Sequence, residues 1–391
     1  MRAEAHAPIE EPRHERVAHR QQRRLYELDV LRFLAAFAVV LYHYTGSPPK
    51  ADTSGFREFH EMTRFTRYAY LGVNLFFIIS GFVILMSIWN RRLGDFAVSR
   101  VVRLMPAYWF SIVLAGVAIV VTGHATAAGV RLWDLVPNLT MLQGGIAVPH
   151  ADGAYWTLWW ELRFYMLVAL LIPLGVTYRN CILFMAAWTF LGIVAKASDT
   201  TWLDVMFMPY RSMYFIAGMA FFLIHRFGSD LLLWLFVLLS WALAVDQTRV
   251  SAGDWAQWQG SWDVPITTAC VTVFFIVMAL VATGRLGWLG SPKIVILGAL
   301  TYPLYLLHGS VAHLLLMNGL IDRIEPWAAL GTTVAVAVAL SYLVHRFVEE
   351  PGGAALHREL KKSLARVRTT ATSTPSRPIP RSPAQPKSPT P

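Results

Sequence analysis

The stretch LDVLRFLAAFAVVLYHYTG (residues 28–46) is almost continuously apolar, yet it contains Arg32 and His43. About 20 apolar residues suffice for a helix to cross a lipid bilayer. An ionisable side chain at the centre of such a helix costs about 2.5–3.5 kcal/mol on insertion scales, so its presence indicates a function. The two residues are 11 positions apart, which is about three helical turns and places both on one face. We therefore expect a membrane helix with a polar face.

The whole chain has the composition of a membrane protein. Of its 391 residues, 55% are hydrophobic and 15% are charged, whereas soluble proteins carry about 25% charged residues. Ten apolar runs have about the length needed to span a bilayer: 28–45, 70–89, 104–122, 155–175, 181–196, 209–225, 231–246, 265–283, 294–317 and 327–346. The sequence thus predicts an all-α, polytopic transmembrane helical bundle of about ten spans.

The net charge of +10 is concentrated near the C-terminus, where residues 357–391 hold eight Lys or Arg and one Glu. This tail is rich in Pro, Ser and Thr, so we expect it to be disordered and to lie against anionic lipid rather than bind nucleic acid. Lys and Arg in the short loops favour cytoplasmic N and C termini. We expect a disordered segment over 1–27, a membrane domain over 28–351 and a disordered tail over 352–391.

Four ionisable residues on four different apolar runs fall in the same layer of the membrane, opposite the cytoplasmic side: His43, Glu161, Arg211 and His308. A histidine near a carboxylate is a general-base arrangement, because the carboxylate orients the imidazole and stabilises its cation. We therefore predict that His43 and Glu161 are catalytic. Each residue taken singly also has a simpler interpretation, as an interfacial anchor or as a hydrogen bond between helices.

The segment RRLGDFAVSRVVRLMPAYW (residues 91–109) gathers four arginines at one membrane entrance. Arg100 and Arg103 are three residues apart and would point the same way from a helix. Paired guanidinium groups suit a phosphate clamp, whereas Arg91 and Arg92 are better explained by the positive-inside rule. The sequence has no Walker or Rossmann glycine pattern, and its two cysteines have no metal-ligand spacing. We therefore predict a polyanionic ligand and no metal.

Several blocks of the sequence match the motifs of one family in the family's order. LDVLRFLAAFAVVLYHY supplies an Arg and, after ten residues, a His, and GVNLFFIISGFVI follows as a second-span signature. RVVRLMPAYW contains Arg-x-x-Arg and Pro-x-Tyr, and YWTLWWELRFY contains Trp-Thr-Leu-x-x-Glu-x-x-Phe-Tyr. YRSMYFIAGM and TYPLYLLHGS match weaker blocks. Over residues 25–351 the chain resembles the bacterial integral-membrane acyltransferase-3 family of O-acyltransferases. Many members have a second Glu where this chain has Leu162, so a role for that carboxylate does not carry over.

The resemblance implies transfer of an acetyl or another short acyl group from cytoplasmic acyl-CoA, acetyl-CoA being the expected co-substrate. The acceptor would be a sugar hydroxyl of an envelope or exported glycan, or of a glycosylated metabolite, and some relatives act on Nod factors or macrolides. His43 would act as the base or as the acyl acceptor, with Glu161 beside it. A multi-pass protein of the bacterial inner membrane is implied. The expected donor-binding residues are Arg32, Arg100, Arg103 and Tyr108, and the expected acceptor-binding residues are Arg211, His308, Trp156 and Tyr165.

Two other functions stay open at this point. A transporter or flippase for a lipid-linked or small-molecule glycan would also carry buried charges in about ten spans, although no inverted repeat or pair of broken helices is recognisable. An inactive sensor or scaffold would suit the basic tail, but it would not require both His43 and Glu161.

Two features outside these motifs have simple structural interpretations. Gly81, in the second apolar run, predicts a close approach between two helices. His150 and Asp152, in the loop PHADGAYW (residues 149–156), are expected to be solvated.

Overall fold

The computed structural model describes residues 25–46, 59–124, 129–198, 200–259, 263–317 and 324–372. Within these ranges the regular elements are helices, and ten helical segments are long and apolar enough to cross a membrane. This confirms the prediction of an all-α, polytopic transmembrane protein of about ten spans. Residues 1–24 and 373–391, in the two segments predicted to be disordered, lie outside the described residues.

The helical segments cover the predicted apolar runs, with three early starts and one late end. The second candidate span begins at Glu61 rather than near 70, and the tenth continues to Val367 rather than ending near 346. The third candidate span begins at Leu93 rather than near 104, and the sixth begins at Thr201 rather than near 209. The longer helices are α2 (Tyr26–Leu41), α4 (Gly72–Ile88), α5 (Leu93–Thr122), α7 (Trp156–Ala169), α9 (Tyr178–Ser198), α11 (Ser212–Phe227), α12 (Leu231–Gln259), α13 (Val264–Ala282), α14 (Val295–Met317), α15 (Pro326–Val344) and α16 (Glu350–Thr372). The shorter helices are α3 (His60–Thr66), α6 (Leu135–Asn138), α8 (Leu171–Leu174) and α10 (Thr201–Phe207), and two π-helical turns are η1 (Tyr42–Gly46) and η7 (His345–Glu349).

Helices α4 and α11 form the centre of the packing. Most residues of both are buried, because other helices surround them: α4 also contacts α2, α7 and α13, and α11 also contacts α9, α12 and α13. They approach so closely at Gly81 and Gly218 that a Cβ on Gly81 would collide with the carbonyl of Phe215, and one on Gly218 with that of Ile78. The close packing predicted at Gly81 is thereby confirmed, and it agrees with the use of small residues between membrane helices.

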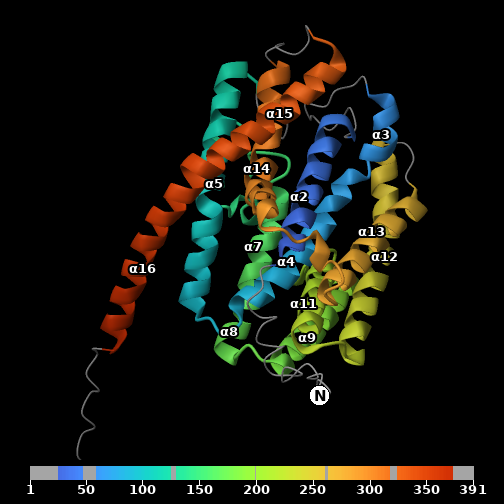
Figure 1. The fold of residues 1–391 in the computed structure, drawn as a ribbon, viewed down its shortest axis with the longest axis vertical. Coiled ribbons are helices and arrows are strands. Elements are labelled where there is room, and N and C mark those ends of the chain that lie inside the picture. The colour runs from blue at the N-terminus through green and yellow to red at the C-terminus, as the bar shows by residue number, and fades with distance from the viewer. Residues whose placement is uncertain are drawn as a thin grey trace, which may run out of the picture.

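Several of the expected site residues lie on helices that surround this centre. In Figure 1, α2, α4 and α14 run through the middle of the molecule, with α5 and α16 on the left and α12 and α13 on the right. Helix α14 packs against α2 and α5 as well as α15. The surface is apolar on the outlying helices, with exposed Val113 and Val120 on α5 and Val273 and Ile276 on α13. Such exposed apolar faces suit a lipid environment.

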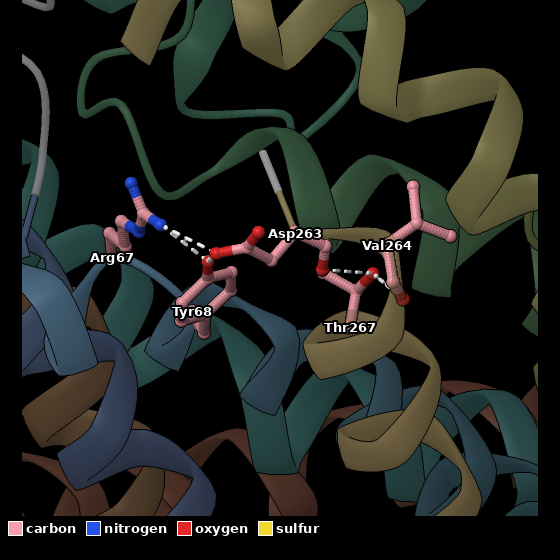
Figure 2. A network of polar contacts seen from close by, with 5 residues as sticks. All are labelled: Arg67, Tyr68, Asp263, Val264 and Thr267. Carbon is pink, nitrogen blue, oxygen red and sulfur yellow. Dashed lines mark hydrogen bonds and ion pairs between the residues drawn. The ribbon is translucent and has the colours of Figure 1, made fainter. Parts of the chain in front are cut away.

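A polar contact ties the segment after α3 to the start of α13. Arg67 donates a hydrogen bond to Asp263 over 3.2 Å and another to the hydroxyl of Tyr68 over 2.6 Å, and that hydroxyl donates to Asp263 over 3.0 Å. Figure 2 shows the side chains of Arg67 and Tyr68 converging on the Asp263 carboxylate. The Thr267 side chain contacts the backbone next to it. Because α3 also packs against η1, this contact links the start of α13 to the part of the chain that contains His43.

The C-terminal tail differs from the prediction between residues 352 and 372, where it forms helix α16 instead of being disordered. The apolar residues Leu356, Leu360 and Leu364 recur every four positions and lie half-buried on one face, toward α5. The proline-rich composition that predicted disorder begins only at Pro375. The composition of the whole tail is dominated by its Pro-rich end, which obscures this helix in the sequence. Helix α16 continues α15 and η7 without a break.

Candidate active site

His43 lies in the π-helical turn η1, directly after α2 ends at Leu41. The turn is braced by α3: the Thr63 hydroxyl donates to the carbonyl of Thr45 over 2.7 Å, and the Thr45 and Thr66 hydroxyls are 3.0 Å apart. A π turn contains more residues per turn than an α-helix, and such turns occur frequently at functional sites. The π turn interrupts the α-helical register between Arg32 and His43, so the two residues are not on one face by their spacing alone.

His43 is paired with His308 of α14, a residue that is fully buried. The Nε2 atom of His308 lies 3.1 Å from Nδ1 of His43, and the two ring centroids are 4.9 Å apart. The Tyr44 hydroxyl donates to the carbonyl of His308 over 2.9 Å, which joins η1 to α14 a second time. The structure thus brings together two of the four residues that the sequence placed in one membrane layer.

The hydrogen bonds of this pair determine which ring nitrogen holds the proton. A carbonyl oxygen only accepts, so Nδ1 of neutral His308, 3.2 Å from the carbonyl of Leu304, carries hydrogen. Its Nε2 then accepts from Nδ1 of His43, which also lies 3.0 Å from the carbonyl of Val39. Neutral His43 therefore has its lone pair on Nε2. An imidazole held in this tautomer is prepared to take a proton at Nε2.

Asp152 belongs to the same group of side chains, although the sequence suggested a solvated loop residue. It is only partly exposed, and its carboxylate lies against Gly309, where any Cβ would collide with it. Burial raises the pKa of the Asp152 carboxyl, while the backbone N–H of Ala154 and the nearby His43 and His313 act in the opposite direction. We call His43, His308 and Asp152 the histidine cluster.

The loop that carries Asp152 is fixed by hydrogen bonds that sequence reasoning missed. Asn138 donates to the carbonyl of Pro149 over 2.9 Å and accepts from the backbone of Ala151 over 2.9 Å. The Tyr155 hydroxyl donates to the carbonyl of Leu306 over 2.9 Å, which attaches the loop to α14 just before His308. Gly309, which directly follows His308, is the one feature of the sequence that could have indicated a side chain packed closely against α14 there.

Glu161 of α7 lies in a different environment from the histidine cluster. Ser80 of α4 donates a hydrogen bond to its carboxylate over 2.7 Å. Glu161 also lines a cavity of about 340 Å³ together with Arg32, Arg100 and Arg103. We call this space the arginine cavity. The structure therefore brings Asp152 to the histidine pair and Glu161 to the arginines, because a similar depth in the membrane does not determine the face of a helix.

The arginine cavity has the side chains expected for a polyanionic ligand with an apolar arm. Three guanidinium groups stand against one carboxylate, and apolar walls come from residues such as Val73, Phe77 and Leu104. The buried Nε of Arg100 has no hydrogen-bond partner among the described residues, so a donor is still available there. Paired guanidinium groups bind phosphate oxygens with defined geometry.

Tyr305 and Thr157 separate the arginine cavity from the histidine cluster. Both residues line the cavity, and their hydroxyl oxygens are 2.7 Å apart. The Tyr305 hydroxyl donates to the carbonyl of Ala154 over 2.9 Å, and its ring centroid is 5.9 Å from that of His308. A single aromatic ring, that of Tyr305, therefore lies between the arginine cavity and the histidine pair.

The other expected site residues, Tyr165, Tyr108, Arg211 and Trp156, lie in three different places. Tyr165 lines the arginine cavity beneath the Arg100 guanidinium, 5.9 Å from the ring centroid, rather than standing with the expected acceptor-binding residues. Tyr108 was expected at the donor, but its hydroxyl donates to the carbonyl of Asn138 over 2.8 Å and so supports the loop of Asp152. Arg211 lies 5.6 Å from the ring centroid of Trp156, so the structure does bring these two together. No group of His, Cys, Asp and Glu suited to a metal occurs in the described part of the chain.

Comparisons with known proteins place this geometry in context. A family model described as an acyltransferase domain matches residues 25–346. Nodulation protein 10 from Rhizobium leguminosarum bv. viciae is 26% identical over 308 residues, covering 72% of this chain and 81% of that protein. Acyltransferase MdmB from Streptomyces mycarofaciens is 27% identical over 376 residues, covering 84% of this chain and 91% of that protein. No solved structure gives a significant match.

Proposed function

We propose a specific reaction for this chain, which belongs to the acyltransferase-3 family and is a multi-pass membrane acyltransferase. The chain transfers an acetyl or another short acyl group from cytoplasmic acyl-CoA to a sugar hydroxyl. The acceptor is part of an envelope or exported glycan, or of a glycosylated metabolite. The protein lies in the bacterial inner membrane with both termini in the cytoplasm, as the distribution of Lys and Arg favours. Membership of an acyltransferase family argues against the transporter alternative.

The arginine cavity receives the donor in this proposal. Arg100 and Arg103 hold the phosphates of coenzyme A, and Arg32 contributes a third positive charge to the cavity lining. The apolar walls accommodate the pantetheine arm, which would direct the thioester toward Tyr305 and Thr157. A small movement of the Tyr305 ring would open the passage to His308 and His43. Positioning of this kind lowers the barrier by bringing the reacting groups together.

His43 supplies the base. Its Nε2 lone pair removes the proton from the acceptor hydroxyl, and the hydroxyl oxygen attacks the thioester carbonyl carbon. The C–S bond then breaks, and the leaving thiolate receives the proton that His43 holds. In the covalent variant of this route, Nε2 attacks the thioester carbonyl carbon first, the C–S bond breaks and the thiolate of coenzyme A leaves. The acceptor oxygen then attacks the acyl carbon, the bond from that carbon to Nε2 breaks, and the hydroxyl proton passes to the thiolate. Both variants need the lone pair at the same nitrogen.

His308 and Asp152 act as positioning residues for His43. His308 fixes the tautomer through its contact with Nδ1, in the way that partners of a catalytic imidazole usually do. Asp152 supplies a carboxylate near the imidazolium that forms during the reaction. Arg211 and Trp156 offer a cation and an aromatic ring for the acceptor, a combination that provides hydrogen bonds together with an apolar contact surface.

One spatial arrangement supports this proposal most strongly. The arginine cavity, the Tyr305 ring and the histidine pair follow one another in space, and the tautomer of His43 suits a base. The test is incubation of the purified, detergent-solubilised protein with radiolabelled acetyl-CoA and the carbohydrate fraction of the source membranes. Wild type should transfer label, and His43→Ala should not. His124→Ala, an exposed histidine variant, should be unaffected. Transfer at the wild-type rate by His43→Ala would refute both variants of the mechanism.

A further inference from the structure

A second basic region lies outside the arginine cavity, between the start of α5 and helix α16. It is a groove of about 500 Å³ formed by two chain segments that are more than 250 residues apart in sequence. We call it the basic groove. Its polar lining consists of Asn90, Arg91, Arg92, Asp95, Ser99, His357 and Lys361. Neither the site described above nor the sequence motifs include the residues that α16 contributes.

The backbone between α4 and α5 places two arginines at the groove. Asn90 adopts a φ of 60° in the left-handed region, which asparagine tolerates better than most residues, and this reverses the chain after α4. Arg91 and Arg92 follow, and α5 begins immediately after Arg92. The positive end of the dipole of this 30-residue helix therefore lies beside their guanidinium groups.

Packing of α16 on α5 forms the other wall. Gly94 leaves room for Leu364, because a Cβ there would be 2.8 Å from a methyl carbon of that leucine. His357 and Lys361 are four residues apart and thus lie on one face of α16, at the edge of its contact with α5. Lys362 points elsewhere: it pairs with Glu359 over 2.9 Å and is exposed.

The charge of the groove is unbalanced. Three cationic side chains, Arg91, Arg92 and Lys361, face one carboxylate, Asp95. None of the three takes part in the ion pairs found among the described residues. Guanidinium and ammonium groups converging from two elements form the usual environment of a phosphate.

The groove and the arginine cavity share one helix. Ser99 lines the groove, and Arg100, which donates a hydrogen bond to the Ser99 hydroxyl over 3.0 Å, lines the cavity. We infer that Arg91, Arg92, His357 and Lys361 form a second phosphate-binding site, next to the donor cavity and separate from it. The phosphate belongs either to the nucleotide end of the acyl donor, which rests on the proposed function, or to the headgroup of an anionic phospholipid.

Binding measurements on the full chain distinguish these sources. Affinities for coenzyme A, dephospho-coenzyme A and adenosine 3′,5′-bisphosphate are measured by calorimetry for wild type, Lys361→Gln, Arg91→Gln/Arg92→Gln and the matched control Lys362→Gln. If the nucleotide end occupies the groove, Lys361→Gln loses about tenfold in affinity for the two ligands with a 3′-phosphate, the expected effect of removing one charge-assisted hydrogen bond, and the double arginine variant loses at least as much. Dephospho-coenzyme A and the control should show no change.

A lipid occupant gives a different result. Nanodiscs with and without phosphatidylglycerol are compared, and the anionic lipid should raise the melting temperature of wild type and Lys362→Gln but not that of the groove variants. Lys361→Gln alters only an exposed side chain, so it tests the site even where the double arginine variant fails to fold. Groove variants that match wild type in both assays would overturn the inference. Because adenosine 3′,5′-bisphosphate binding needs no chemistry, retained binding without acyl transfer would refute the proposed reaction alone.

Discussion

The histidine cluster and the arginine cavity use buried polar residues in opposite ways. In the histidine cluster, each polar group has a near partner, and hydrogen bonds from η1, α14 and the loop of Asp152 fix the geometry. In the arginine cavity, three guanidinium groups face about 340 Å³ of space and one carboxylate. Fixed geometry suits proton transfer, whereas an open cationic space suits a large anionic ligand. Variants in the first region should therefore change mainly kcat, and variants in the second should change mainly KM for acyl-CoA.

The largest effect is expected from His43→Gln. Glutamine retains a hydrogen-bond donor but cannot take a proton, so kcat should fall by about 10³- to 10⁴-fold with little change in KM for acyl-CoA.

His308→Gln should lower kcat by about 10- to 100-fold, since it disturbs the tautomer of His43 without removing the base. Steady-state kinetics with purified protein measure both. An equal loss in the two variants would mean that His308 also reacts with substrate.

Arg100→Gln is expected to change the opposite parameter. Loss of one guanidinium from the cavity should raise KM for acyl-CoA by about tenfold or more and leave kcat within about threefold. Arg64→Gln is the control, because Arg64 is 73% exposed and pairs with Glu61 over 3.4 Å on the surface. A fall in kcat at unchanged KM would place Arg100 in the chemical step and remove the contrast between the two regions.

Asp152→Asn should lower activity and raise stability. Without the carboxylate the imidazolium of His43 is less stabilised, so kcat should fall by about tenfold. Burial raises the pKa of Asp152, so its contribution to folding stability is greatest below about pH 4 and is lost as pH rises through the raised pKa. The variant should therefore melt at a higher temperature than wild type at neutral pH, and the difference should vanish toward pH 4.

The measurement is a series of thermal unfolding curves between pH 4 and pH 8. Asp246→Asn serves as the control, because Asp246 is 57% exposed and forms a surface ion pair with Lys196 over 2.9 Å. A variant less stable than wild type at pH 7 would contradict the assignment, since it would mean that His43 and His313 stabilise the carboxylate more than burial destabilises it.

The sequence predicted the helical fold, because apolar runs of bilayer length have few alternatives. It also identified most residues of both regions, since ionisable groups in membrane helices are rare. It did not predict which residues meet. The π turn at Tyr42–Gly46 changes the direction of His43 and leaves no signal in the composition. Asp152 looked like an ordinary loop residue, because its position depends on hydrogen bonds made by Asn138 and Tyr155.

The smallest effect is expected from Glu161→Gln. This variant tests whether Glu161 acts with the arginine cavity rather than with the histidine cluster. The amide oxygen of glutamine can still accept the hydrogen bond from Ser80, so the variant removes a charge with little change in shape. In the arginine cavity this leaves a more positive space, and KM for acyl-CoA should fall by up to about threefold at nearly constant kcat. The sequence motif instead predicted a partner of His43. If that prediction is right, Glu161→Gln will lower kcat at least as much as Asp152→Asn does.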